Sequence, residues 1–163
     1  PEVTRVGQYI LYRVDGQPLK LAAGITGVDH DGWITGTAEE KVARAAYNRF
    51  DVSGDGPGLA IVKLSREAWC TGGRARAVAR IGPIGIGADN QPAIERVTAT
   101  RVGTVYDCKT TGISLPVPGG PWRVEVTVSP TFSPHDIDVN HGDRRQLGAV
   151  FTAYFQPLFA SGG

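Results

Sequence analysis

One segment of the sequence combines the residue types that a bound cation would need. It runs from His135 to Asp143, and Asp136, Asp138 and Asn140 stand at positions one, three and five of a possible calcium loop. This spacing lets a loop wrap a hard cation such as calcium. A histidine stands where the glycine of a calcium loop belongs, and a leucine stands where the final glutamate belongs. The segment therefore predicts either a calcium site at Asp136, Asp138 and Asn140 or a solvated loop whose carboxylates cap turns.

Other candidate chemistry is weaker. The fragment Asp51, Ser53, Asp55 and Gly56 has the same opening spacing, but its twelfth position is a valine, so we interpret it as a glycine-rich turn. The histidines and cysteines lack the spacing of zinc ligands. No nucleophile elbow or phosphate loop occurs, and no pattern selects a pair of carboxylates for glycoside hydrolysis. We expect the domain itself to be non-catalytic.

The tryptophans offer a different kind of site. Sugar rings stack on exposed aromatic faces, while carboxylates, amides and arginines beside them bind the hydroxyl groups. Trp122 is in register with core valines and is assigned to the core. Trp33 and Trp69 each stand beside a turn, so they are candidates for sugar contact, with core packing as the alternative for each. The candidate ligand-binding residues are Trp33, Trp69, Asp136, Asp138 and Arg145.

Short strands would position these residues. Between 122 and 128 and between 147 and 155, apolar and other residues alternate with the period of a strand. Turn signals recur about every 8–12 residues, and the only capping box, Thr37 with Glu40, predicts at most one short helix. We therefore predict one all-β domain over residues 1–163, an antiparallel β-sandwich of the jelly-roll type with eight to ten strands.

The composition excludes several classes of protein. Lys and Arg number 17 against 16 Asp and Glu, a net charge of +1, and no basic run could neutralise a series of phosphates, so no nucleic-acid partner is expected. No apolar run approaches the roughly 18 residues that span a bilayer. The chain begins at Pro1 and contains no methionine, so we expect a piece of a longer protein, whose other parts can include a membrane portion.

Two cysteines, Cys70 and Cys108, allow one intramolecular pairing. Cys70 follows a predicted strand and Cys108 ends another, and such strand ends could meet. A bridge would close a loop of about 38 residues and stabilise the fold by about 3–4 kcal/mol in the chain-entropy model. The alternative is a pair of reduced thiols in a cytosolic protein. We expect the disulfide, and with it an extracytoplasmic location.

Three segments carry a resemblance to a known family. They are residues 27–36 with their Asp-Gly-Trp, residues 65–69 (SREAW), and above all VEVTVSPTFSPHDID followed by GDRRQLGAVF. Together they resemble the extracytoplasmic C-terminal domain of multi-pass, glycosyltransferase-like membrane proteins of actinobacterial type. The sharpest part is Ser129 to Pro134, followed by Asp143-Arg144 and Leu147-Gly148. The chain departs from the family pattern in the polar insert 135–141 and in Glu39-Glu40-Lys41.

The resemblance implies a carbohydrate-binding-module-like domain of the cell envelope. It would stand outside the membrane, contact the membrane portion of its parent protein, and bind or present an envelope polysaccharide or lipid-linked sugar. Asp143 and Arg144 correspond to the family's Asp-Arg pair, which implies a structural ion pair that fixes the last loop. The alternative function is a structural or protein-interaction β-sandwich, such as an adhesin or a surface-assembly subunit, with no sugar site.

Overall fold

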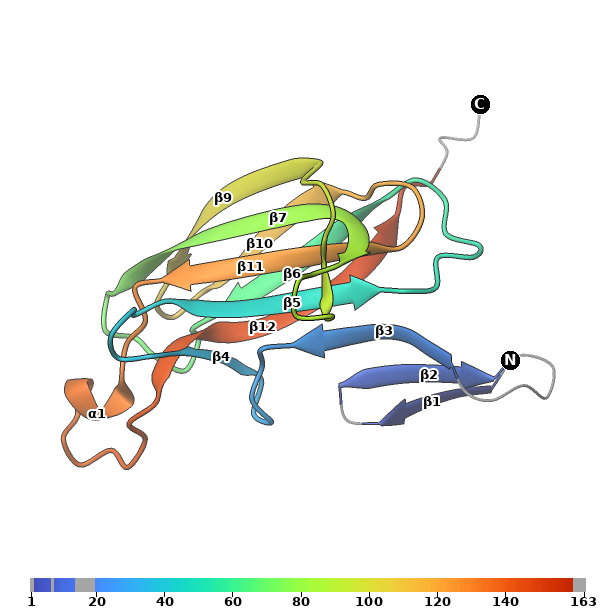
Figure 1. Ribbon diagram of the computed structural model, residues 1–163. Helices are drawn as coiled ribbons and strands as arrows, with labels where there is room; N and C mark the ends of the chain where they lie inside the picture. Colours follow the sequence, from blue (N-terminus) through green and yellow to red (C-terminus); the bar gives the residue numbers. More distant parts are fainter. Residues whose placement is uncertain (1, 7, 14–19, 160–163) are drawn as a thin grey trace.

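The computed structural model describes residues 2–6, 8–13 and 20–159 (Figure 1). In this part of the chain nearly all regular structure is strand, so the predicted all-β class is confirmed. The elements in chain order are β1 (Glu2–Val6), β2 (Tyr9–Arg13), β3 (Lys20–Thr26), β4 (Trp33–Gly36), β5 (Ala43–Arg49), β6 (Gly58–Ser65), β7 (Arg74–Ile86), β8 (Pro92–Ile94), β9 (Ala99–Tyr106), β10 (Thr110–Pro116), β11 (Trp122–Ser129), α1 (Pro134–Ile137) and β12 (Gln146–Pro157).

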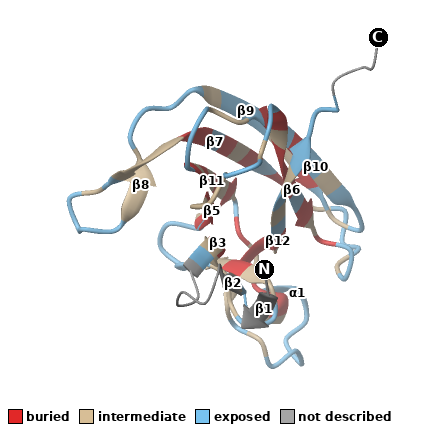
Figure 2. Cartoon of the chain, turned by 90° about the vertical axis from the view of Figure 1, so that its right-hand side faces the viewer, coloured by how far each residue is buried: buried red, intermediate tan, exposed pale blue. Residues whose placement is uncertain are grey.

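The strands form one antiparallel sheet that curls on itself (Figures 1 and 2). Its order around the curl is β9, β7, β11, β5, β4, β12, β6 and β10, and the ribbon of β3, β2 and β1 extends from β5. The end strands β9 and β10 contact each other without pairing in the described ladders, and the Thr111 hydroxyl donates to the Thr104 carbonyl at 2.9 Å across that seam. The predicted sandwich is therefore a single curled sheet, because β4 pairs with both β12 and β5 and joins the two layers.

The core lies inside the curl, where the strand period of two places it (Figure 2). Every second residue of β11 is buried, from Trp122 to Val128. In β7 the inward positions are the small alanines 75, 77 and 79, and the outward positions on either side of them are Arg74, Arg76, Val78 and Arg80. Small inward side chains let the opposing strands approach closely at native packing density. The alternation predicted for residues 122–128 is confirmed, and β7 follows the same pattern.

The helix predicted after Thr37 is wrong. Thr37 does accept a hydrogen bond from the Glu40 backbone N–H at 3.2 Å, as in a capping box, but the chain makes one turn and continues as β5. β5 pairs with β11 on one side and with β3 on the other, and most of its residues are buried. Pairing and burial outweigh a weak local helix preference. The four-residue helix α1 lies elsewhere, in the loop before β12.

The glycine- and proline-rich sequence of residues 81–93 predicts a long loop, but the structure shows an extension of the sheet there. β7 continues to Ile86 and pairs with β8, and the Gly87 N–H donates to the Gln91 carbonyl at the turn between them. Pro83 has no N–H to donate to a neighbouring strand. Its carbonyl still accepts a hydrogen bond from the Glu95 N–H at 2.9 Å. The sequence also predicts a hairpin turn at Asp15-Gly16, which lies outside the described residues.

Candidate functional site

The structure brings Trp33 and Trp69 together at one end of the curl, on either side of Phe132. Trp33 begins β4, Trp69 lies in the loop between β6 and β7, and Phe132 lies between β11 and α1. The Phe132 ring is 5.9 Å from that of Trp33 and 5.4 Å from that of Trp69, both edge to face. The His141 ring lies 5.4 Å from Trp69. These four half-buried or exposed side chains form what we call the aromatic cluster.

A clamp of charged residues stands beside the aromatic cluster. The Arg145 guanidinium donates to Asp29 at 2.9 Å, to Asp31 at 2.7 Å and to Asp143 at 2.7 Å. We call these four residues the Arg145 clamp. It joins the loop before β4 to the loop before β12. Arg145 is about one-third exposed, at 36%, so the clamp faces water. Its carboxylates retain free lone pairs that can accept further hydrogen bonds.

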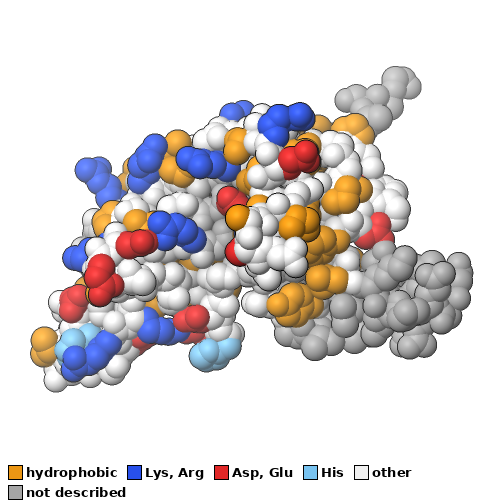
Figure 3. Space-filling view, in the orientation of Figure 1, with side chains coloured by type: hydrophobic (Ala, Val, Ile, Leu, Met, Phe, Trp, Pro, Cys, Tyr) orange, Lys and Arg blue, Asp and Glu red, His pale blue; other side chains and the backbone are white. Residues whose placement is uncertain are grey.

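Backbone hydrogen bonds tie the clamp to the aromatic cluster. The Trp33 N–H donates to the Asp31 carboxylate at 3.4 Å, and the Asp29 N–H donates to the Trp33 carbonyl at 2.9 Å. On the other loop, the Asp143 N–H donates to Nδ1 of His141 at 3.1 Å. Movement of either loop would therefore move both the aromatic rings and the charges. Figure 3 shows acidic, basic and histidine side chains gathered at this end of the molecule, around α1.

Arg66 supports the aromatic cluster from the interior of the fold. It is 3% exposed, and its guanidinium lies over the Phe132 ring, 4.8 Å from the centroid. Nε donates to the Gly148 carbonyl at 2.7 Å, Nη2 to the Pro130 carbonyl at 3.1 Å, and Nη1 to Asp107 at 3.4 Å. One buried cation thus joins β12, the end of β11, the turn after β9 and an aromatic ring. We call Arg66 and Asp107 the buried ion pair.

Asp107 is satisfied on all sides. Burial alone would raise its pKa, but hydrogen bonds from the Thr71 hydroxyl and the Gly73 N–H, together with the charge of Arg66, hold the pKa below its usual value. Asp107 is therefore ionised in the folded protein at neutral pH. The ion pair fixes the loop that carries Trp69, because Thr71 and Gly73 belong to that loop.

Gly148 lets β12 approach closely enough to meet Arg66. A Cβ at this position would lie 2.7 Å from the Ala43 Cβ and 3.1 Å from the Ile34 side chain. Such contacts are shorter than real side chains tolerate, so the backbone would have to shift. The register of β12 against β4 also changes between Leu147 and Val150, as in a bulge, and such irregularities re-aim nearby groups. Glycine is required here for packing rather than for a left-handed conformation.

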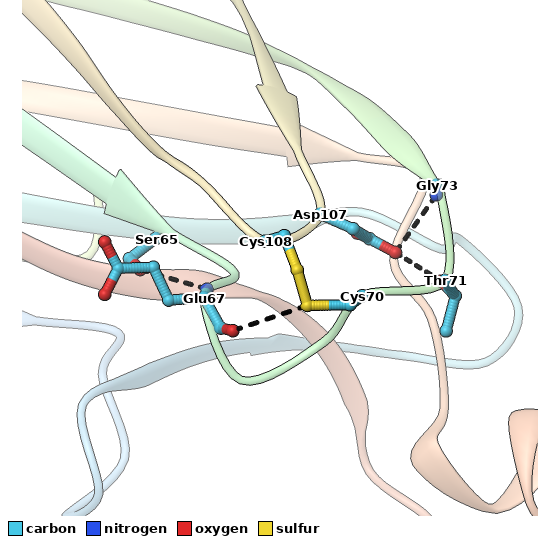
Figure 4. The surroundings of a disulfide bond; sticks show 7 residues. All are labelled: Ser65, Glu67, Cys70, Thr71, Gly73, Asp107 and Cys108. Atoms are coloured by element: carbon cyan, nitrogen blue, oxygen red, sulfur yellow. Dashed lines mark hydrogen bonds between the residues drawn. A yellow bond between two sulfur atoms is a disulfide. The ribbon is translucent and has the colours of Figure 1, made fainter.

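The disulfide between Cys70 and Cys108 is confirmed, with the two Cα atoms 4.7 Å apart (Figure 4). It links the loop after β6 to the turn after β9, next to Asp107. The Trp69 carbonyl also accepts a hydrogen bond from the Cys108 N–H at 2.6 Å. Covalent and hydrogen-bonded links therefore position Trp69 from its C-terminal side. Disulfides are typical of oxidising, extracytoplasmic environments.

The segment from His135 to Asp143, which we call the acidic loop, contains the residues predicted to bind a metal ion. Asp136 is exposed on α1, and the Asp138 carboxylate accepts a hydrogen bond from the Asn140 N–H at 3.0 Å, which is a local turn. In the described part of the chain, no three His, Cys, Asp or Glu side chains are grouped to hold a metal ion. Nor does any described hydrogen bond or ion pair link Asp136 or Asp138 to Trp33 or Trp69. Calcium stays a prediction, as does sugar contact by these two aspartates.

Asp143 forms an ion pair, but the predicted partner, Arg144, is wrong. Asp143 pairs with Arg145, whose Nε and Nη2 both donate to its carboxylate, and Arg144 is exposed. The Asp143 carboxylate also accepts a hydrogen bond from the Arg145 N–H at 2.9 Å, which is a local Asx turn. This turn brings Arg145 rather than Arg144 to Asp143. Arg145 is held by three carboxylates, and its role in binding a ligand stays a prediction.

Four contributors to the site were missed in the sequence: Asp29, Asp31, Arg66 and Phe132. The signal for Phe132 was its position between Pro130 and Pro134, where the strand pattern had already ended. Asp31 was visible only as the first residue of an Asp-Gly turn. Arg66 carried no local signal, because its partners lie 41 to 82 positions away along the chain.

The Arg145 clamp predicts a specific loss of stability in acid. Hydrogen bonds from Arg145 hold the pKa of Asp31 and Asp143 below the usual 3.8. Because these folded-state values are lowered, the stabilisation is complete above the unfolded-state pKa and is lost as the pH falls through the folded-state values. Urea unfolding from about pH 7 to about pH 3 should show a smaller acid-induced loss in Arg145→Gln than in the wild type. Equal losses in both proteins would contradict this account.

Comparison of the chain with protein-family models, curated protein sequences and solved structures finds no match. The resemblance drawn from the motifs is accordingly a hypothesis that rests on the residues themselves. The described residues contain no helix with the length and apolar character of a membrane span.

Proposed function

We propose that the chain is a non-catalytic glycan-binding β-domain, with its sugar site at the aromatic cluster and the Arg145 clamp. The observation that carries the proposal is the convergence of Trp33, Phe132 and Trp69, from three separate segments, next to surface carboxylates. Trp33 and Trp69, which the sequence offered as candidates for sugar contact, both contact Phe132.

The arrangement suits a sugar chemically. Half-exposed indole rings offer apolar faces to the C–H surface of a pyranose or furanose ring, and nearby carboxylates can accept hydrogen bonds from its hydroxyl groups. The buried ion pair, the disulfide and the clamp hold the rings before a ligand arrives, which reduces the ordering cost of binding. The loop of Asp29 also lines a surface hollow of about 720 Å³, which leaves room for a ligand to extend.

The wider setting is part of the same proposal. We infer that the domain works in the cell envelope, outside the membrane, as a part of a glycosyltransferase-like membrane protein, and that its ligand is an envelope polysaccharide or lipid-linked sugar. The disulfide and the motif resemblance support this setting. Calcium bound at Asp136, Asp138 and Asn140 is the cofactor that the sequence predicts.

The test is a titration of intrinsic tryptophan fluorescence with arabinan, galactan and mannan oligosaccharides, in calcium and in EDTA. We expect a saturable change for at least one glycan. Trp33→Ala and Trp69→Ala should each weaken binding about tenfold or more, because aromatic side chains that the ligand covers carry most of the energy of such contacts. A change that requires calcium would assign the cation a role in binding.

Trp122 provides an internal control. It is 1% exposed in the core and packs on Tyr47, so the double variant Trp33→Ala/Trp69→Ala retains one emitter that sugar cannot reach. That residual emission should not respond to glycan. If the folded wild-type protein responds to no glycan at millimolar concentration, the structural or protein-interaction function becomes the better account.

A further inference from the structure

The outer face of β7 carries three arginines that the fold does not use. Arg74, Arg76 and Arg80 are exposed, and none of the ion pairs among the described residues involves them. Figure 3 shows a row of basic side chains along the upper part of this face, over β7 and β9. We call the three arginines the basic face.

The excess of positive charge is confined to this face of the molecule. The whole chain has a net charge of only +1, so a row of unpaired cations requires acidic residues to be concentrated elsewhere. Many of them gather at the α1 end, in the Arg145 clamp and the acidic loop. On the basic face the nearest cross-strand acid is Glu125, opposite Arg80, and it is already bound to Arg123 at 2.8 Å. A positive field therefore extends over this face and favours anionic partners.

Hydroxyl groups flank the arginines in the sheet register. Arg76 lies between Thr104 of β9 and Ser129 of β11, and Arg80 is opposite Thr100 of β9. A hollow of about 390 Å³ is lined by Arg74, Arg76, Thr104 and Ser129, among others. Guanidinium groups bind carboxylates and phosphates in a bidentate manner, and the hydroxyls between them can bind sugar hydroxyls.

The strand beneath is hydrogen-bonded on both sides. β7 pairs with β9 over residues 74–81 and with β11 over residues 76–83. At about 3.3 Å per residue, Arg74 and Arg76 are about 7 Å apart along the strand, and Arg76 and Arg80 about 13 Å. A row of fixed charges on this scale matches a linear polymer that repeats its charge from one unit to the next.

We propose that the basic face binds an anionic polysaccharide, one whose sugar units carry carboxylate or phosphate groups. The interleaved hydroxyls favour this ligand over a lipid surface, because membrane-binding faces combine cations with large apolar side chains that insert. The exposed apolar residues here are only Val102 and Tyr106. This surface is formed by different side chains from those of the aromatic cluster, so the domain would hold a charged polymer and a separate glycan at once.

The experiment measures binding to immobilised polygalacturonate at low and at high salt, with dextran as a neutral polymer. The triple variant Arg74→Gln/Arg76→Gln/Arg80→Gln should bind about tenfold more weakly, from the loss of three surface charge contacts. Wild-type binding should weaken as salt screens the charges. The triple Arg→Lys variant keeps the charge but loses the bidentate geometry. Its affinity should therefore lie between that of the wild type and that of the triple Gln variant.

Two controls make the result specific. The variant Lys41→Gln/Lys63→Gln/Arg144→Gln removes the same charge from exposed positions elsewhere and should bind like the wild type. Trp33→Ala should also bind polygalacturonate normally, which separates this proposal from the sugar site at the aromatic cluster. Normal binding by the triple Gln variant, or no binding by the wild type, would overturn the proposal. So would stronger binding to phosphatidylglycerol vesicles than to the polymer, which would identify a membrane instead.

Discussion

Replacing Arg66 with methionine should lower the free energy of unfolding by about 3–5 kcal/mol, the cost of removing one member of a buried ion pair. Methionine fills much of the space but donates no hydrogen bond. Asp107, itself 5% exposed, would remain as a buried carboxylate without its cation. The carbonyl oxygens of Gly148 and Pro130 would lose their donor as well, and a buried acceptor without a partner is costly.

Urea unfolding followed by far-ultraviolet circular dichroism measures this loss. Arg76→Met is the matched control, because Arg76 is exposed on the outer face of β7 and such surface changes stay within about 0.5 kcal/mol. A loss of less than about 1 kcal/mol in Arg66→Met would show that the buried ion pair does not anchor this end of the sheet.

Removing the disulfide, as Cys70→Ala/Cys108→Ala, should lower the free energy of unfolding by about 3–4 kcal/mol. The bridge closes a loop of 38 residues, and its loss restores the conformational entropy of that loop to the unfolded chain. The folded state should be affected most near Trp69, whose carbonyl is bound to the Cys108 N–H.

Unfolding of the wild type with and without dithiothreitol, beside the double variant, separates the effect of the bond from that of the side chains. Reduced wild type and the variant should unfold at similar urea concentrations, well below the oxidised protein. If the oxidised and reduced proteins unfold at the same concentration, the bridge contributes no net stability. Equal glycan affinity in both forms would show that Trp69 is positioned by its other contacts.

Much of the fold could be predicted from the sequence because the curled sheet has one buried face. Several strands then show a period of two, as in β7, β11 and β12, and the inward residues of β11 and β12 were identified from the sequence. Periodicity does not determine how the strands are connected, so one curled sheet and a two-layered sandwich look alike. Local signals also misled where tertiary pairing prevailed, as at Thr37 and in the extension of β7 to Ile86.

The site was predictable only where single residues carried a signal. Trp33 and Trp69 were selected because each stands beside a turn, where an aromatic face can be exposed to a sugar, and the cysteines because only one pairing was possible. Phe132 and Arg66, which hold the tryptophans together, depend on partners far apart in the sequence. The wrong partner for Asp143 came from the family resemblance, whereas a local turn between Asp143 and Arg145 brings Arg145 to the carboxylate.

The most direct test of the glycan site follows the three tryptophan indole N–H signals by nuclear magnetic resonance during titration with the glycan. The chain contains three tryptophans, so each signal reports one position: the aromatic cluster for Trp33 and Trp69, and the core for Trp122. The account predicts that the Trp33 and Trp69 signals shift together and saturate, while that of Trp122 stays in place. Binding that leaves the Trp33 and Trp69 signals unmoved would contradict it.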